Sequence, residues 1–411
     1  MSITGRFRPD HRVRVRRYNE TSHNFQAATD ISADVLAIQT TKAYGQVAGG
    51  FSLTTTLKLA DFWETVNPDD LLTIELDPGD GTGLKPVLTG LINRIAETLS
   101  VDQAGLPSRS IRVSGFDLGK ILHYHNCAWD VARYDKHFGD ELMSRIDQGL
   151  RVSGTPSELI QSLVQTYLHA QVPWTESWLL LDRMDDSDDW MTLDYTLARH
   201  EGPLWQVMKQ LSNEPWNVLH TETGADGKAH VVLERTPFHG VTGKLTRETF
   251  HSVSDSQAVA FDLGRDDTER TNWVWYDPHL MMFGQKDASV GYLGVQRDLL
   301  GYDEDSVFRH GMRGQHITTM FTPFGTKHLE PASPNDIARA GERGLALWNW
   351  YRRNHAYRNG SLTTKGNPAY RSGDGVVFDG NEYLIEQVSQ NYVWGQMYQT
   401  TLGLTRGQVH E

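Results

Sequence analysis

Short segments in which apolar and polar side chains alternate recur at both ends of this chain, and they constrain its fold more than any other feature. Residues 12–16 read Arg-Val-Arg-Val-Arg, a period of two that places one face of a strand on a core and the other in water. Residues 67–70 and 77–83 are rich in Asn, Pro, Asp and Gly, the residue types of tight turns. Several short strands separated by such turns predict a small sandwich or barrel over residues 1–120.

Helical patterns are confined to the middle of the chain and to one later segment. Residues 155–158 read Thr-Pro-Ser-Glu, the order of a helix start with an N-cap, a first-turn proline and a capping box. A second helix is expected over residues 203–211, followed by a hairpin over residues 216–233. The longest helix is expected to begin with Ser333 as its N-cap and to stop near Gly360.

Strand patterns return after residue 360, in residues 375–378, 382–388 and 398–405. The order along the chain is therefore β, then mixed α, then β–α–β, and no internal repeat is evident in the sequence. These patterns predict an α+β fold that is mainly β.

Composition excludes several classes of protein. The chain has 411 residues, with 39 Lys and Arg against 52 Asp and Glu, so its formal charge is −13. Such an acidic balance argues against a protein that holds nucleic acid on a basic face. One cysteine excludes an intramolecular disulfide framework, cysteine-only zinc sites and iron–sulfur clusters. No apolar run reaches the length of about 18 residues that a membrane span needs, and the N-terminus lacks the apolar core of a signal peptide.

Three motifs could carry chemistry, and each also has a plainer interpretation. Residues 184–189 contain four aspartates that could hold Ca²⁺, but they lack the EF-hand pattern and also fit a solvated acidic loop. His123, His125 and Cys127 are metal-capable and would share one face of a strand, whereas the helix that we favour here would splay them. Residues 79–85 have the glycines of a phosphate loop without its spacing, so they predict a hairpin loop. We expect no catalytic residues, no metal and no bound cofactor.

Two groups of residues are candidates for contacts with other proteins. An arginine cluster near the N-terminus could touch nucleic acid, but we favour a basic edge that meets an acidic patch on a partner subunit. An aromatic group on the longest helix could be a ligand platform, or, at helical spacing, part of the core or of a subunit interface. The arginines are Arg6, Arg8, Arg12, Arg14, Arg16 and Arg17, and the aromatic residues are Trp348, Trp350 and Tyr351.

The C-terminal stretch is the most specific text in the sequence. Residues 366–374 have the form G-x-P-x-x-x-x-G-D, residues 383–388 the form Y-x-I-E-x-V, and residues 398–407 the form Y-x-T-x-L-x-L-x-R-G. Earlier in the chain come Gly-Phe-Asp at residues 115–117 and a helix followed by a hairpin over residues 203–234. Together and in this order, the motifs resemble those of phage tail baseplate hub proteins, which are related to the late control protein D family and to the hub part of type VI secretion spikes.

The resemblance implies two small antiparallel β-barrel, tube-like domains with an intervening mixed α/β region and an insertion. The first hub barrel would take residues 1–120, and residues 121–234 would form the mixed helical and hairpin domain. The second barrel would combine residues 235–275 with 358–411, and residues 276–357 would hold an insertion and the long helix. Residues 276–333 have no counterpart that the resemblance places.

The resemblance also implies a mechanical role in a virion tail that we expect to be contractile. Three chains would form a pseudo-sixfold ring that joins a hexameric tail tube protein to a trimeric central spike protein, the spike being a separate chain. The baseplate, with its wedge and tape measure proteins, would be assembled in the host cytoplasm, without membrane insertion by this chain. DNA would pass through the lumen without specific binding, and we hypothesise that the excess acid lines this lumen and repels the phosphates.

Two other classes of function stay open from the sequence. The chain could be a hub-associated cell-wall-degrading enzyme, with Glu201 or acids among residues 185–189 as acid and base. It could instead be a receptor- or carbohydrate-binding tail protein that uses the aromatic residues of segment 273–276.

Overall fold

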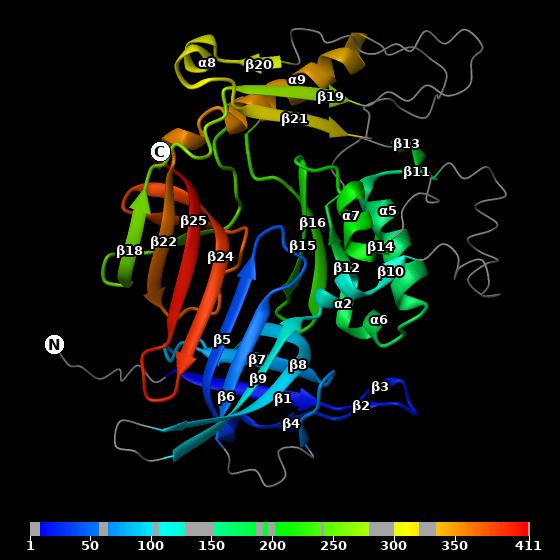
Figure 1. Ribbon diagram of the computed structural model, residues 1–411, viewed down its shortest axis with the longest axis vertical. Coiled ribbons are helices and arrows are strands. Elements are labelled where there is room, and N and C mark those ends of the chain that lie inside the picture. Colours follow the sequence, from blue (N-terminus) through cyan, green and yellow to red (C-terminus); the bar gives the residue numbers. More distant parts are fainter. Residues whose placement is uncertain are drawn as a thin grey trace.

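Strands from both ends of the chain meet in one large sheet. The computed structural model describes residues 9–56, 65–101, 107–127, 152–185, 192–195, 202–239, 242–278, 300–319 and 334–409 (Figure 1). Thirteen strands belong to this sheet. They are β1 (Asp10–Arg16), β4 (Thr29–Asp30), β5 (Val35–Ala43), β6 (Gly50–Thr55), β7 (Leu71–Asp77), β8 (Lys85–Val101), β9 (Pro107–Asp117), β17 (Phe250–Ser252), β18 (Ala258–Gly264), β22 (Arg358–Lys365), β23 (Gly375–Phe378), β24 (Asn381–Val393) and β25 (Gln399–Val409).

The predicted alternation explains how the first strand is buried. Val13 and Val15 are 0% and 2% exposed, while the arginines that alternate with them point to the other face of β1. Each valine buried in this way contributes on the order of 1.5–3 kcal/mol relative to an exposed one. The strand pairs antiparallel with β7 over its whole length, so its inward face joins the core of the first half of the sheet.

The two halves of the sheet share one topology although the sequence shows no repeat. The path runs β18-β22-β25-β24-β5-β6-β9-β8-β7-β1-β4, and β23 and β17 branch from β24. Six strands of the first half follow the order β5-β6-β9-β8-β7-β1, and six of the second follow β18-β22-β25-β24-β23-β17. Chain order matches as well; the one difference in direction is that β17 is parallel to β23, whereas β1 is antiparallel to β7.

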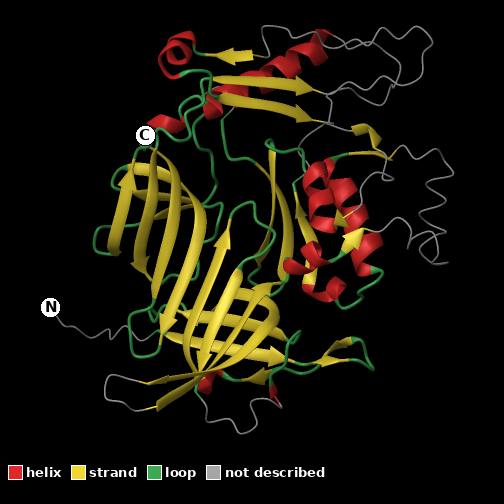
Figure 2. Cartoon of the chain, viewed as in Figure 1, coloured by secondary structure: helices red, strands yellow, loops and turns green. Residues whose placement is uncertain are grey.

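The predicted fold class, α+β and mainly β, is confirmed by these large antiparallel sheets (Figure 2). The pairings among the described strands form an open path that ends at β18 and β4, and no closed barrel is assigned. The antiparallel pairing of β24 with β5 joins strands of the two predicted barrel ranges within one sheet.

A helical unit packs against a separate three-stranded sheet. Thr155 caps its first long helix as predicted: Glu158 N donates to Thr155 Oγ1 at 3.4 Å, and Thr155 N donates to Glu158 Oε2 at 3.1 Å. The helices are α2 (Lys120–Tyr124), α5 (Pro156–Leu163), the π-helix η2 (Val164–His169), α6 (Thr175–Trp178) and α7 (Leu204–Leu211). The sheet contains β12 (Leu179–Met184), β16 (Ala229–Arg235) and β15 (Asn217–Thr223), the last two being the predicted hairpin.

A peripheral unit is formed by β19 (Trp273–Pro278), β20 (Leu300–Tyr302), β21 (Gly314–Thr319), α8 (Glu304–His310) and α9 (Pro334–Tyr351). Short elements complete the described residues: β2 (Tyr18–Asn19), β3 (Asn24–Phe25), β10 (Asn126–Cys127), β11 (Val152–Gly154), β13 (Thr192–Tyr195), β14 (Gly202–Pro203), and the 3₁₀ turns η1 (Ser32–Asp34) and η5 (Asn354–Ala356). In the described part of the chain, no helix combines the length and apolarity that crossing a membrane requires.

The predicted stop of the longest helix near Gly360 is wrong. Helix α9 ends at Tyr351, and Gly360 lies inside β22. The carbonyl of Trp350 accepts a hydrogen bond from Arg406 Nη1 at 3.0 Å, so a distant side chain satisfies a carbonyl of the last turn. Ser333, the predicted N-cap, lies outside the described residues.

Candidate functional site: a neutral polar sheet face

The junction between the two halves makes one continuous wall of strands. The C-terminal part of β24 pairs antiparallel with β5 through seven residue pairs, from Gln387 opposite Ala43 to Val393 opposite Ala37. In Figure 1, β22, β25, β24, β5 and β6 lie side by side across this junction. The wall therefore joins residues that are about 350 positions apart in the sequence.

The solvent face of this wall is covered by hydroxyl and amide side chains. Ile38 and Thr40 of β5 point into the core, so the strand period turns Gln39 and Thr41 to the other face. The same alternation holds on the neighbouring strands. We call the resulting set the polar wall face: Gln39, Thr41, Ser52, Thr54, Ser361, Thr363, Gln387, Ser389, Asn391, Gln399 and Thr401.

Hydrogen bonds link this face across the strands. Thr363 Oγ1 and Thr401 Oγ1 are 3.1 Å apart, and Thr41 Oγ1 lies 3.3 Å from Ser389 Oγ, across the junction of the halves. Cross-strand pairs of this kind each contribute roughly 0.2–1 kcal/mol. None of the members of the polar wall face carries a charge. Charged groups border it: Asp262 of β18 lies opposite Ser361, Arg112 of β9 donates to Ser52 Oγ, Lys365 ends β22, and Glu386 precedes Gln387 on β24.

A buried polar network supports the wall from the core side. Gln390 Oε1 accepts hydrogen bonds from Tyr398 at 2.7 Å and from Thr400 at 2.5 Å, and Gln390 Nε2 donates to Asn367 O at 3.2 Å. Burial raises the pKa of Tyr398, so its hydroxyl stays a donor. Because every one of these groups has a partner, the network holds β24, β25 and the turn before β23 in one register.

Behind the wall, Lys42 and Asp117 form an ion pair that is largely removed from water. Lys42 also donates to Thr221 Oγ1 at 2.7 Å, which ties β5 to β15 of the helical unit. Asp117 accepts from the backbone N–H groups of Gly49 at 2.9 Å and Gly119 at 3.0 Å. Burial raises the pKa of Asp117 and lowers that of Lys42, because desolvation disfavours both charges and their attraction offsets only part of it.

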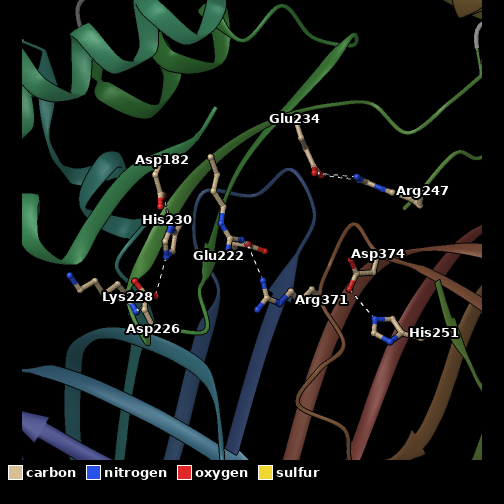
Figure 3. A network of polar contacts seen from close by, with 11 residues as sticks. Asp182, Glu222, Asp226, Lys228, His230, Glu234, Arg247, His251, Arg371 and Asp374 are labelled. Atoms are coloured by element: carbon tan, nitrogen blue, oxygen red, sulfur yellow. Dashed lines mark hydrogen bonds and ion pairs between the residues drawn. The ribbon is translucent and has the colours of Figure 1, made fainter. Parts of the chain in front are cut away.

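Arginine–carboxylate pairs connect the helical unit with the second half of the sheet (Figure 3). Glu222 of β15 accepts from Arg371 Nη1 at 3.2 Å and also pairs with Arg183 of β12. Arg371 lies in the turn before β23, so this contact spans two units.

A second pair anchors the segment that leads into β17. Arg247 donates to Glu234 through both terminal nitrogens, at 2.8 and 3.1 Å, and to the Tyr44 hydroxyl at 2.6 Å. Burial acts to raise the pKa of Glu234, but the Arg247 pair outweighs it and the net shift is downward. Tyr44 follows β5, so this cluster joins three parts of the chain.

Two histidines extend the same network. His230 of β16 lies between two carboxylates, with Nδ1 2.7 Å from Asp182 Oδ1 and Nε2 3.1 Å from Asp226 Oδ1. His251 of β17 lies 3.0 Å from Asp374 through Nε2. Figure 3 shows these contacts on either side of the Glu222–Arg371 pair.

The network lines a cleft of about 1030 Å³ between the three-stranded sheet and the second half of the large sheet. Seven carboxylates and four arginines face it, an excess of three negative charges. These groups are Asp182, Asp185, Glu222, Glu234, Glu248, Asp374 and Glu382, with Arg183, Arg235, Arg247 and Arg371.

Replacing Glu222 with glutamine should lower the free energy of unfolding by about 1–3 kcal/mol, because Arg183 and Arg371 lose a common charged acceptor. Urea denaturation of the purified chain measures the change. Glu248→Gln is the matched control, since Glu248 lines the same cleft but is exposed, and it should change stability by less than about 0.5 kcal/mol. Equal urea midpoints for Glu222→Gln and the parent would contradict a stabilising role for the Glu222 ion pairs.

The predicted arginine edge is placed on β1 and just after it. Arg14 Nη2 lies 2.9 Å from Glu75 Oε1 on β7, and Arg12 Nη1 lies 3.4 Å from Glu75 Oε2. Arg16 ends the strand and Arg17 follows it on the surface. A partner for this edge stays a prediction. Arg6 and Arg8 lie outside the described residues.

The aromatic group on α9 is packed inside the protein. Trp348 and Trp350 are 9% and 4% exposed and belong to different core clusters, and Tyr351 packs against both clusters. The Arg406 guanidinium lies 3.2 Å from the centre of the Trp350 ring. This burial agrees with the core alternative, and a subunit contact through these residues stays a prediction.

The other sequence motifs are not brought together as a site. His123 is exposed on α2, His125 follows that helix and Cys127 lies in β10. Within the described ranges, no group of three or more metal-capable side chains occurs. Residues 79–85 form the predicted hairpin connection from β7 to β8. Asp185 lines the cleft, whereas residues 186–189 and Glu201 lie outside the described part.

Local sequence patterns do not reveal the ionic network or the polar wall face. Glu222 and Lys42 were signals, since each is a charged residue within a segment that otherwise reads as a half-buried strand. Their partners, Arg371 and Asp117, are distant in sequence, and no local pattern selects them. The wall face was visible as serine and threonine in alternating strands, but nothing local shows that β5 and β24 are neighbours.

Comparison with known proteins gives matches in structure only. No family model matches the sequence, and no curated protein matches it. A tail protein from Neisseria meningitidis MC58 superposes with a TM-score of 0.55 at 13% identity, covering 96% of both chains. A 43 kDa tail protein of prophage MuSo2 from Shewanella oneidensis superposes with a TM-score of 0.54 at 12% identity, covering 97% of this chain and 98% of that one. At such identities the likeness shows the fold: along nearly its whole length, this chain is folded as these two tail proteins are.

Proposed function

We propose that the chain is a structural hub of a phage tail baseplate, in which three copies form a ring around a conduit for DNA. The fold shared with two tail proteins supports a place in the tail. The polar wall face is the single observation that carries the conduit, because it runs uninterrupted across both halves of the sheet.

A neutral, hydrated surface suits the passage of DNA. Duplex DNA carries about one negative charge per 1.7 Å, so a basic lining would retain it by releasing counterions. Hydroxyl and amide groups offer neither charge nor an apolar patch, and two pairs of the hydroxyls are already bonded across strands. We therefore propose a lining that is mainly neutral, with Asp262 and Glu386 as the acidic groups at its border; the acid-lined bore stays a prediction.

The internal repeat of topology supports the choice of three copies. Each chain contributes two similar halves, so three chains place six similar sheets around an axis. Such a ring would match a hexameric tail tube on one side and a trimeric spike on the other, with wedge and tape measure proteins around and above it. We extend the proposal to a contractile tail and to a location in the virion baseplate.

The polar contacts of the cleft favour a scaffold over a hydrolase. Glu222, Glu234 and Asp374 are each paired with a basic side chain, an arrangement that joins units of the fold. The aromatic segment of β19 is also engaged: Val274 and Tyr276 are buried, and Trp275 stacks on His316 with the ring centres 4.6 Å apart. We therefore favour the structural role over a cell-wall-degrading enzyme and over a glycan-binding protein.

Native mass spectrometry and negative-stain electron microscopy of the purified chain test the ring. We expect three times the mass of the chain and a ring with an open bore. A chain that stays a monomer at micromolar concentration and degrades cell walls in a zymogram would sink the proposal.

Lysines placed on the polar wall face should convert the conduit into a DNA-binding surface. Ser389→Lys combined with Thr401→Lys adds two charges per copy beside the junction of the halves. The variant ring should retard duplex DNA in a gel, with retention that falls steeply with salt, while the parent should not. A parent ring that already binds DNA tightly would contradict a non-adhesive lining.

A further inference from the structure

We propose that neighbouring copies join by strand addition, with β18 of one copy pairing antiparallel with residues 93–101 of β8 in the next copy. The inference rests on the proposed ring and names the contact that closes it. Its basis is a pairing that already exists inside the chain, the one between β24 and β5.

The internal pairing shows which edges are available. The first part of β24 pairs with β23 and its second part, on the same edge, pairs with β5. Strand β8 holds the place of β24 in the first half of the sheet, and its first part pairs with β7 over residues 85–91. Among the described strands, residues 93–101 pair with β9 alone, and β18, which holds the place of β5, pairs with β22 alone.

Matching irregularities in the two halves fix the register. The ladder of β24 with β25 shifts between Ile385 and Gln387, and that of β8 with β9 shifts between Ile92 and Arg94. Aligning these shifts equates Gln387 with Arg94, and therefore Tyr392 with Leu99.

The partner strands align in the same way. The ladder of β5 with β6 shifts between Val35 and Ala37, and that of β18 with β22 shifts between Ala258 and Ala260. This alignment equates Ile38 with Phe261 and Ala43 with Asp266.

The side chains at the deduced positions complement one another. Inside the chain, Tyr392 pairs with Ile38, and both are buried, at 3% and 0% exposed. The equivalent residues, Leu99 and Phe261, are also apolar and lie on strands, but each is 59% exposed. Exposed apolar edge strands are unusual in isolated proteins and mark sites where another strand adds. The proposed pairing would bury Leu99 against Phe261.

Charge agrees with the same register. Gln387 pairs with Ala43 inside the chain, and the equivalent pair between copies is Arg94 opposite Asp266. Both of these side chains are exposed in the single chain. Opposite charges directly across an antiparallel pair are stabilising, whereas a shift of one residue would place Arg94 opposite Arg265. The contact is head-to-tail, since each copy offers one β18 edge and one β8 edge, so repetition around an axis closes a ring.

Cysteine cross-linking tests the register directly. In a background where the single cysteine is removed by Cys127→Ser, Leu99→Cys combined with Phe261→Cys should yield covalent trimers on non-reducing gels after mild oxidation. Each single substitution should stay monomeric on the same gels. Leu99→Cys with Asp262→Cys is the register control, because neighbouring residues of a strand face opposite sides, and it should not cross-link.

A charge exchange tests the same contact without cysteine. Arg94→Glu should raise the dissociation constant of the ring at least about tenfold, and adding Asp266→Arg should restore it. Both residues are exposed, so circular dichroism melts should match the parent. Rings that form by mass but neither cross-link at residues 99 and 261 nor respond to Arg94→Glu would overturn this inference and leave the hub proposal standing. A chain that never forms rings would overturn the hub proposal itself.

Discussion

Replacing Asp117 with alanine should lower the free energy of unfolding by about 3–5 kcal/mol, the largest effect that we expect from a single substitution. The Asp117 side chain is 6% exposed and accepts hydrogen bonds from Lys42, Gly49 and Gly119. Its removal leaves the Lys42 ammonium in a site largely closed to water, without the opposite charge. Guanidinium denaturation, followed by tryptophan fluorescence, measures the loss.

The matched control is Asp255→Ala, an exposed aspartate in the turn before β18, which should change stability by less than about 0.5 kcal/mol. A double-mutant cycle with Lys42→Met should show that the two losses are not additive, since removing both charges leaves neither unpaired. Additive losses would mean that Lys42 and Asp117 act separately.

Acidification should destabilise the protein through His220, which is 2% exposed in β15. Burial lowers the pKa of His220 to about 4, an effect opposed by Glu234 and reinforced by Lys42, Arg247 and Arg183. In the unfolded chain the same histidine titrates near 6.5, so between these pH values only the unfolded state takes up the proton. The stability present above pH 6.5 is therefore lost progressively as the pH falls toward 4, by about 3 kcal/mol for this group.

His220→Gln should remove this part of the pH dependence, because glutamine does not titrate. The measurement is the free energy of unfolding of parent and variant at pH 7 and at pH 4.5, compared as the difference between the two values for each protein. His123→Gln, at an exposed position on α2, serves as the control and should keep the parent's dependence. The assignment fails if His220→Gln loses as much stability on acidification as the parent does.

Local patterns were enough to predict most of the elements. The alternation at residues 12–16 gave the strand β1 and its buried valines, and the Thr-Pro-Ser-Glu order gave the start of α5 with its capping box. The stop of α9 could not be read in this way. Gly360 is a residue type that commonly ends helices, but α9 stops nine residues earlier, at Tyr351. There Arg406 lies over the Trp350 ring and donates a hydrogen bond to the Trp350 carbonyl.

The polar wall face was also predictable only in part from the sequence. Alternation alone determines that Gln39 and Thr41 share a face of their strand, and that Ser389 and Asn391 share a face of theirs, because a strand turns successive side chains to opposite sides. That these two faces form one surface depends on the pairing of β24 with β5, between residues about 350 positions apart. The ionic pairs Lys42–Asp117 and Glu222–Arg371 likewise join distant segments. The sequence by itself therefore determined the strands, their faces and the turns, whereas only the tertiary structure decided which strands are neighbours and which edges stay open, since that choice depends on packing over the whole chain and not on local periodicity.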